Sequence, residues 1–309
     1  MGKTITIQNE FLTVSAKTNG AQLSSIKTHT GIELLWQGNP QIWCGQAPIV
    51  FPILGGLPEQ KYLYKGKEYY IPFHGFARDF QWEGVKNSEC EMVFILQSDY
   101  KTKTSYPFDF LFELTYRLED NKIIKKHRIR NDSDCPMYYQ VGGHDAYNIA
   151  LYEGETMNDY YVDFYEIESI YPYKQNSKWF ESGTHEYRLD SGKLYVGMNT
   201  FKAPELPLNA FAMKANFGKS ISLKNKRGNY HVKLDFPDFP WLLLWTKGND
   251  TDNNYVCLEP CSGLSEATYS GPQIQDKIGM SSLAPGDYDD LFYCMTFEVD
   301  DFFYGKKND

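Results

Sequence analysis

Residues 254–261 read Asn254-Tyr255-Val256-Cys257-Leu258-Glu259-Pro260-Cys261, a run of strand-forming residues with one carboxylate followed at once by proline. Proline favours extended geometry in the residue before it. We therefore expect Glu259 where a strand leaves its sheet. Most Glu-Pro pairs only mark strand ends, but a carboxylate on a rigid element at a sheet rim is well placed for proton chemistry.

The rest of the chain repeats short strands between turns rich in Gly, Asn and Asp, and helical periodicity is almost absent. One short helix is expected at 44–50. The expected strands are Thr4–Ile7, Leu12–Ser15, Ala21–Ile26, Tyr62–Tyr64, Glu68–Ile71, Glu91–Gln97, Leu111–Leu118, Lys122–Arg130, Ser220–Lys224, Tyr230–Phe236, Leu242–Trp245 and Leu291–Val299. This spacing predicts an all-β protein of antiparallel sheets, a sandwich or a barrel-like assembly. Without a linker or a repeat, residues 1–309 are expected to form one domain, with 171–187 as a long surface loop.

Composition narrows the function classes. The formal charge of −9 argues against a nucleic-acid partner, because phosphate binding requires basic patches. Aromatic residues make up 16% of the chain, and their rings are good platforms for sugars or bases. No signal segment or membrane-spanning apolar run is present, and the six cysteines are scattered. We expect a soluble cytoplasmic protein with free thiols, and the oligomeric state stays open.

Two histidines stand next to glycines, which allow unusual backbone geometry: His74 precedes Gly75, and His144 follows Gly143. In Pro72-Phe73-His74-Gly75-Phe76-Ala77-Arg78, Gly75 permits a positive φ and the His74 ring could face a cleft. In the stretch 139–148, Gly142 and Gly143 break a strand just before His144. A satisfied turn histidine and a buried histidine bonded to backbone are the alternatives for the two rings.

A metal site is not expected, because such sites usually contain a closely spaced pair of ligands and the chain has no His-x-His or His-x-x-x-His. The segment 250–254 begins like a calcium loop but lacks its glycine and glutamate, so we expect a turn there. No Gly-x-Ser-x-Gly elbow points to nucleophilic hydrolysis. Acid/base chemistry on an uncharged substrate fits the residues better.

Five short motifs in this order resemble the aldose 1-epimerase (galactose mutarotase) family, particularly its LacX-like bacterial branch. The motifs are Gly20-Ala21-Gln22-Leu23-Ser24-Ser25-Ile26, Ala47-Pro48-Ile49-Val50-Phe51-Pro52, His74-Gly75-Phe76-Ala77-Arg78, Gly142-Gly143-His144 and Leu258-Glu259-Pro260. The resemblance implies a large antiparallel β-supersandwich with an open groove for a sugar. It also implies interconversion of α and β anomers without a cofactor. Carried over by position, Glu259 is the base, His144 the acid and His74 a hydrogen-bonding histidine beside the ring oxygen.

Three positions depart from the family pattern. Gly56 stands where relatives usually have an arginine that reaches the substrate. Its absence would weaken substrate binding unless Lys61 or Arg78 compensates. Asn209 replaces an aspartate, and it keeps a hydrogen-bonding group but loses the charge. Asp145 replaces proline after His144, and we expect this negative neighbour to raise the pKa of the histidine. The altered binding shell predicts a non-standard sugar.

An epimerase for a free or modified hexose is the leading interpretation. The alternatives are a non-catalytic sugar-binding protein on the same scaffold, or an epimerase for hexose 6-phosphates. The last requires positive charge, for which the candidates are Arg78, Lys61 and Lys214. Trp241 and Trp245 flank an apolar run, so either could stack on a sugar, and core packing is expected for at least one.

Overall fold

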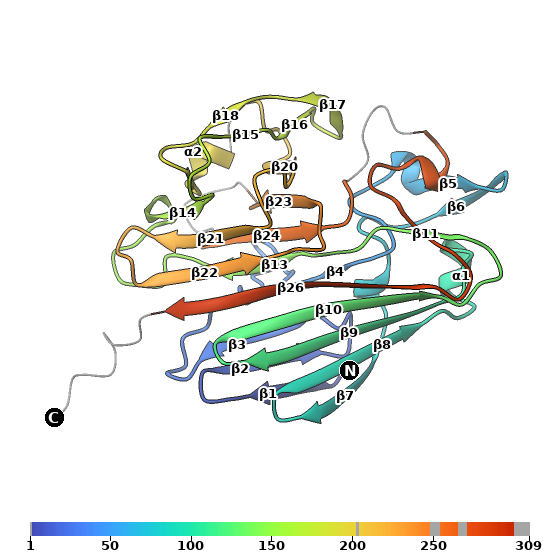
Figure 1. Ribbon diagram of the computed structural model, residues 1–309, viewed down its shortest axis with the longest axis horizontal. Helices are drawn as coiled ribbons and strands as arrows, with labels where there is room; N and C mark the ends of the chain where they lie inside the picture. Colours follow the sequence, from blue (N-terminus) through green and yellow to red (C-terminus); the bar gives the residue numbers. More distant parts are fainter. Residues whose placement is uncertain (1, 202–203, 248–253, 265–270, 300–309) are drawn as a thin grey trace.

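The computed structural model describes residues 2–201, 204–247, 254–264 and 271–299, and most of it is antiparallel strand (Figure 1). The largest sheet has nine strands in the order β19-β14-β21-β22-β26-β10-β9-β8-β7. Its strands are β7 (Glu83–Ser88), β8 (Glu91–Gln97), β9 (Phe110–Glu119), β10 (Lys122–Asn131), β14 (Tyr160–Asp163), β19 (Lys193–Tyr195), β21 (Ser220–Asn225), β22 (Tyr230–Asp235) and β26 (Tyr288–Val299). Residues along β9 and β10 alternate between buried and less buried positions, as in a sheet with one face on the core.

A second sheet of six strands lies against the first and carries the candidate site. Its order is β20-β23-β24-β12-β4, and β13 also pairs with β24. These strands are β4 (Ile49–Val50), β12 (Gly142–Gly143), β13 (Asp145–Asn148), β20 (Ala210–Lys214), β23 (Trp241–Trp245) and β24 (Tyr255–Cys261). All seven residues of β24 are buried, because the strand runs through the middle of the sheet.

The remaining strands form small sheets around these two. A three-stranded sheet contains β1 (Thr4–Gln8), β2 (Leu12–Lys17) and β3 (Leu23–Thr28). The paired strands are β5 (Lys61–Tyr64) with β6 (Lys67–Tyr70), β11 (Met137–Tyr139) with β25 (Ser281–Leu283), β15 (Ser169–Ile170) with β18 (Tyr187–Arg188), and β16 (Tyr173–Gln175) with β17 (Phe180–Thr184). Helix is confined to α1 (Thr102–Ser105), α2 (Met198–Phe201) and the 3-10 turns Pro58–Gln60, Ala77–Asp79, Met157–Asp159 and Ile274–Asp276 in the described part of the chain. None of these helices has the length and apolarity needed to cross a bilayer.

The all-β, antiparallel class predicted from the sequence is confirmed, but the predictions of a helix at 44–50, of a strand-end position for Glu259 and of a surface loop at 171–187 are wrong. No helix forms at 44–50; Ile49 and Val50 instead pair with the two glycines of β12. Glu259 lies inside β24 rather than at its end, because Pro260 occupies a strand position opposite Leu242. The turn expected at 250–254 falls almost wholly outside the described residues.

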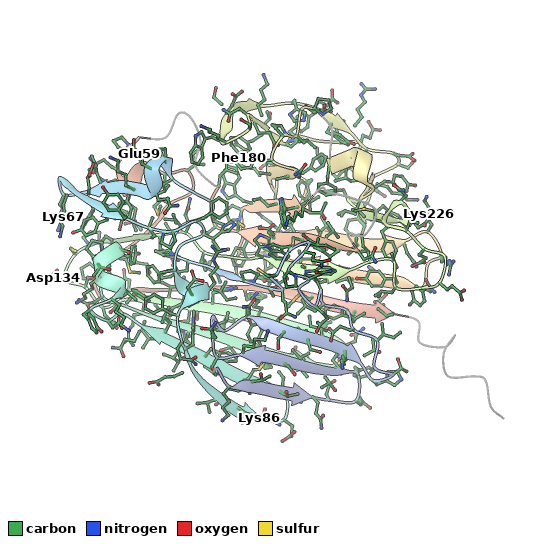
Figure 2. The ribbon with its side chains drawn as sticks, turned by 180° about the vertical axis from the view of Figure 1, so that it is seen from behind. Glu59, Lys67, Lys86, Asp134, Phe180 and Lys226 are labelled. Atoms are coloured by element: carbon green, nitrogen blue, oxygen red, sulfur yellow. The ribbon has the colours of Figure 1, made fainter. Side chains whose placement is uncertain are left out.

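The segment 171–187 is not a simple surface loop either. It contains the β16–β17 hairpin and lies near the end of the molecule opposite β1 and β7 (Figure 1). Phe180 of this hairpin is only 3% exposed, and Figure 2 labels it among the strands at the top of the view. The polar composition of the segment indicated a surface loop, although Phe180 is a buried aromatic residue within it.

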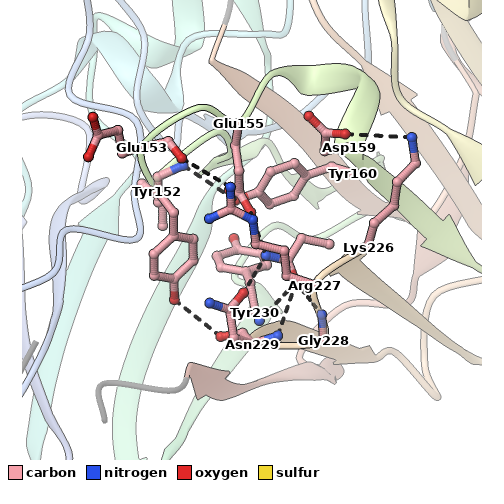
Figure 3. A network of polar contacts seen from close by, with 12 residues as sticks. Tyr152, Glu153, Glu155, Asp159, Tyr160, Lys226, Arg227, Gly228, Asn229 and Tyr230 are labelled. Atoms are coloured by element: carbon pink, nitrogen blue, oxygen red, sulfur yellow. Dashed lines mark hydrogen bonds and ion pairs between the residues drawn. The ribbon is translucent and has the colours of Figure 1, made fainter. Parts of the chain in front are cut away.

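A polar network around Glu155 ties the chain after β13 to the β21–β22 hairpin (Figure 3). The Glu155 carboxylate accepts hydrogen bonds from the Tyr160 hydroxyl at 2.5 Å and from the Asn225 amide at 2.9 Å. Arg227 adds an ion pair at 3.6 Å and also donates to the Glu153 carbonyl at 3.0 Å. The Glu155 carboxylate is buried, so these donors satisfy a group that would otherwise destabilise the fold.

Candidate active site

The middle of β24 places Glu259 beside His144. β12 and β13 both keep the register that sets His144 directly opposite Glu259, although the ladder of hydrogen bonds is interrupted between these two short strands. Residues opposite each other in an antiparallel pair point to the same face. The Nδ1 atom of His144 lies 3.5 Å from the Oε1 atom of Glu259. The sheet therefore brings together the two residues that the sequence proposes as acid and base.

Packing behind this pair explains both glycines before His144. A Cβ atom on Gly143 would overlap the hydroxyl of Tyr293, and one on Gly142 would lie 2.9 Å from the Sγ atom of Cys261. Neither position can hold a side chain without moving a neighbouring strand. The glycines thus let β12 approach closely enough to present His144 to Glu259.

A buried ion pair lies directly behind the site. Lys125 of β10 and Asp145 of β13 are both fully buried, and the ammonium donates to Asp145 Oδ1 at 2.8 Å. The Tyr293 hydroxyl donates to the other carboxylate oxygen. The Lys125 ammonium also lies over the rings of Tyr116 and Tyr293. This network joins the two large sheets at the residue next to His144.

Burial favours the uncharged form of both side chains. It raises the pKa of Glu259 well above 4.5, and the negative charge of Asp145 raises it further. Burial lowers the pKa of His144 to about 4. Asp145 raises the pKa of His144, as predicted, but burial has the larger effect, so the net shift is downward. Between these two pKa values the pair therefore holds one proton, on Glu259.

His74 faces the same cleft with its tautomer fixed. The backbone N–H of Gly55 donates to His74 Nδ1 at 2.9 Å, which leaves Nε2 as the N–H donor. Burial, with His144 and Arg78 nearby, holds the pKa of His74 well below 6.5. The backbone carbonyl of Phe51 occupies the space of a Gly75 side chain, and Gly75 has a φ of +72°, so this turn requires glycine.

Aromatic rings form the walls of the cleft. Trp245 lies edge-on to His144 with ring centroids 5.5 Å apart, whereas Trp241 is buried in the core. Trp43 stacks on His144 with ring centroids 5.1 Å apart and also lies edge-on to Trp245 at 5.4 Å. The sequence predicted core packing for at least one of the two tryptophans, and Trp241 meets this prediction, whereas sugar stacking by Trp245 stays a prediction. Trp43 was missed because its place at the cleft depends on tertiary contacts.

Phe73 explains the absence of a side chain at residue 56. A Cβ atom on Gly56 would lie 2.8 Å from the Phe73 ring, which lines the cleft. An arginine at this position would have to displace that ring. Arg78 lines the cleft and donates to the Phe73 carbonyl at 2.8 Å, whereas Lys61 is paired with Glu59 and Glu68.

Three predicted binding residues, Gly56, Asn209 and Lys214, lie outside the cleft lining in the described structure, and one cation was missed. Asn209 sits in the turn before β20, and its neighbours Leu208 and Ala210 line the cleft in its place. Lys214 lies over the Trp241 ring. Lys178, next to the β16–β17 hairpin, lines the cleft instead. Nothing in its local sequence distinguishes Lys178 from other exposed lysines.

The cleft has a volume of about 340 Å³, at the small end of small-molecule sites. It combines aromatic walls with a few polar groups, as sugar sites require. The residues that line it are Trp43, Phe73, His74, Arg78, His144, Lys178, Phe180, Leu208, Ala210, Leu243, Trp245 and Glu259.

A larger hollow of about 950 Å³ lies on the outer face of the nine-stranded sheet. Its lining mixes Val85, Val93 and Phe292 with charged residues, but contains no histidine or cysteine. One of its carboxylates, Asp290, is already paired with Lys126 and Arg128. The smaller cleft therefore has the better chemistry.

A family model described as aldose 1-epimerase matches residues 3–270. The chain belongs to the aldose 1-epimerase family. Protein LacX from Lactococcus lactis subsp. lactis is a relative in this family, 32% identical over 306 residues that cover 95% of this chain and 99% of that protein. Family membership supports a sugar epimerase or mutarotase.

Solved structures agree with the fold of the family. A galactose mutarotase related enzyme from Lactobacillus acidophilus has a TM-score of 0.89 and 29% identity, covering 96% of this chain and 99% of that one. A galactose mutarotase-like protein from Lactobacillus casei has a TM-score of 0.84, covers 96% and 100% of the two chains and, at 22% identity, supports the fold alone.

Replacing Asp145 with Asn leaves the Lys125 ammonium buried without its counter-ion. We expect Asp145→Asn to lower the free energy of unfolding by about 3–5 kcal/mol, and the double variant with Lys125→Met to recover much of this loss. Urea denaturation of both variants measures the effect. Arg188→Ala, which breaks a 3.8 Å pair in which the Arg188 side chain is 86% exposed, is the control and should change stability by less than about 1 kcal/mol. Equal effects of Asp145→Asn and Arg188→Ala would contradict this interpretation.

Proposed function

We propose that this protein is an aldose 1-epimerase that interconverts the anomers of a hexose or modified hexose without a cofactor. The observation that carries the proposal is the buried contact of 3.5 Å between His144 and Glu259 in an aromatic cleft of one-sugar size. The pair has one mobile proton, and anomer exchange requires one group that accepts a proton and one that donates it.

In the proposed reaction, the pair first moves its proton from Glu259 to His144, which creates a carboxylate and an imidazolium. Glu259 then removes the proton of the anomeric hydroxyl, and an oxygen lone pair forms the C1 carbonyl. The bond from C1 to the ring oxygen breaks, its electron pair stays on that oxygen, and His144 donates a proton to it. The His74 Nε2–H group, fixed by the Gly55 hydrogen bond, stabilises the same oxygen.

The open-chain sugar then rotates about the C1–C2 bond. The ring oxygen attacks the other face of the carbonyl, returns its proton to His144, and the carbonyl oxygen takes the proton back from Glu259. Ring closure leaves a carboxylate and an imidazolium, and the imidazolium returns its proton to Glu259. Both groups then end in their resting states, so the cycle is balanced for protons and electrons. Trp43 and Trp245, which both contact the His144 ring, offer aromatic surface for a flat sugar ring and limit access of water.

Arg78 and Lys178 support a second candidate, an epimerase for anionic sugars such as hexose 6-phosphates. Both lysine and arginine line the cleft, and Arg78 is held by the Phe73 carbonyl. Two cations at one cleft fit a phosphate or carboxylate substituent better than the sequence alone suggested.

Glu259→Gln keeps the shape of the side chain but removes the base. We expect kcat for mutarotation of freshly dissolved α-glucose or α-galactose to fall about 10²–10⁴-fold, as measured by polarimetry. Glu113→Gln, in the larger hollow, is the matched control and should keep the wild-type rate. Sugar binding by the wild type without any acceleration would instead support a non-catalytic sugar-binding protein.

The pH profile of kcat/KM tests the single shared proton. Below the pKa of His144, about 4, both groups are protonated and no base remains, so activity falls as pH decreases. Above the raised pKa of Glu259 the pair has lost its proton and no acid remains, so activity falls as pH increases. We expect a plateau between these limits after subtraction of the uncatalysed rate. An acidic limb near pH 6.5 would show that His144 titrates like an exposed imidazole and would refute the assignment.

Lys178→Ala separates neutral from anionic substrates. If the substrate is anionic, kcat/KM for a hexose 6-phosphate should fall about tenfold, with little change for the unphosphorylated hexose. NMR exchange spectroscopy on both sugars measures the two rates. Lys174→Ala, an exposed lysine of β16 outside the cleft lining, is the control. Equal losses for both sugars would exclude a phosphate contact at Lys178.

A further inference from the structure

We propose that His144, Cys257 and Glu259 form a binding site for one divalent transition-metal ion, with Zn²⁺ as the best fit, and that the bound ion blocks the reacting pair. One ligand atom of each residue lies within 4.8 Å of the other two. The metal site stands on these contacts alone. Its inhibitory effect rests on the proposed function.

The backbone fixes the positions of the three donors. Cys257 and Glu259 are two residues apart on β24, so their side chains leave the same face of the sheet. His144 is held opposite Glu259 by the register of β12 and β13. Pairing on both sides fixes the backbone of β24, so the donors would come together by side-chain rotation alone.

The distances are compatible with a zinc ion after a small contraction. Zinc bonds of about 2.0–2.3 Å place neighbouring ligands of a tetrahedral site about 3.3–3.8 Å apart. The contact between His144 and Glu259 already has this length, at 3.5 Å. The Cys257 thiol must approach by at most about 1.5 Å, which a rotation of its side chain and that of Glu259 can supply.

An unpartnered nitrogen points to the same position. The Nδ1 atom of His144 is buried and makes no hydrogen bond, although the residue is only 7% exposed. Buried polar atoms without a partner are rare and costly. A cation between the three residues would satisfy this lone pair. The neutral imidazole favoured by burial is the form that binds metal.

The donor types select the ion. Nitrogen, thiolate and one carboxylate oxygen suit Zn²⁺ or Co²⁺, whereas Ca²⁺ and Mg²⁺ require mainly oxygen ligands. Asp145, the neighbouring carboxylate, is already bound to Lys125 and Tyr293. Three protein ligands leave a fourth position, and His144 and Glu259 line the cleft on which it would open.

Binding must release protons. Burial raises the pKa of the Cys257 thiol and of the Glu259 carboxyl, so each loses a proton when it becomes a ligand. Affinity should therefore rise with pH, and the ion would hold Glu259 and His144 in a form that can neither accept nor donate a proton.

The test is titration of the tag-free full chain with Co²⁺, followed by competition with Zn²⁺. We expect one ion per chain, with the near-ultraviolet absorption of a cobalt–thiolate bond. Cys257→Ser should abolish this band and weaken binding at least about 100-fold, because loss of an outer-shell partner alone costs about 10–100-fold. Cys261→Ser is the matched control, since Cys261 is buried on the same face of β24 but outside the cluster.

Two results would overturn the site: no Co²⁺ or Zn²⁺ binding at millimolar concentration, or wild-type affinity in Cys257→Ser. Should Cys257→Ser fail to fold by circular dichroism, Glu259→Gln provides the same comparison through loss of the carboxylate ligand. Zinc should also inhibit mutarotation reversibly, with chelator restoring the metal-free rate. A protein that binds cobalt as expected but accelerates no mutarotation would refute the proposed function while leaving the metal site established.

Discussion

The ion pair of Lys125 and Asp145 is the constraint on which the candidate site depends. Two opposite charges without solvent are stable only if each has its full set of partners, and here Tyr293 completes the set. The pair joins β10 of the large sheet to β13 of the smaller one, one residue from His144. It fixes the separation of the sheets and adds negative charge behind Glu259. The packing between the two sheets therefore sets the positions of His144 and Glu259 and much of their electrostatic environment.

The cleft shows how burial and function are coupled. Glu259 is 1% exposed and yet lies on its floor, so the free energy that burial costs a carboxylate is converted into a raised pKa. The same burial lowers the pKa of His144. Two opposite shifts in neighbouring groups produce a pair with one shared proton over a broad range of pH. In a water-exposed pair the single proton would instead lie on the imidazole, between about pH 4.3 and 6.5.

Much of the fold was predictable because the local sequence pattern identifies most strands. Alternation along β9 and β10 and the turns beside them required no long-range information. The prediction of a helix at 44–50 failed because Ile49 and Val50 pair with Gly142 and Gly143 of β12. Local periodicity cannot reveal a partner so far along the chain. The same limit explains Trp43 and Lys178, whose places at the cleft depend on tertiary contacts. Cys257 was partly visible, since it shares a strand face with Glu259, but its proximity to His144 required the pairing of β13 with β24.

The position of Glu259 inside a strand has an evolutionary consequence. A strand that is hydrogen-bonded on both sides tolerates few changes of sequence or length. The proposed base Glu259 therefore lies where an insertion would disrupt the sheet. The side chains that frame the cleft, Phe73, Lys178 and Leu208, lie instead in turns or beside a short hairpin. Such segments accept substitutions and changes of length at little cost to the fold. New sugar preferences can thus arise by altering the rim, while the ancestral chemistry beneath it stays intact.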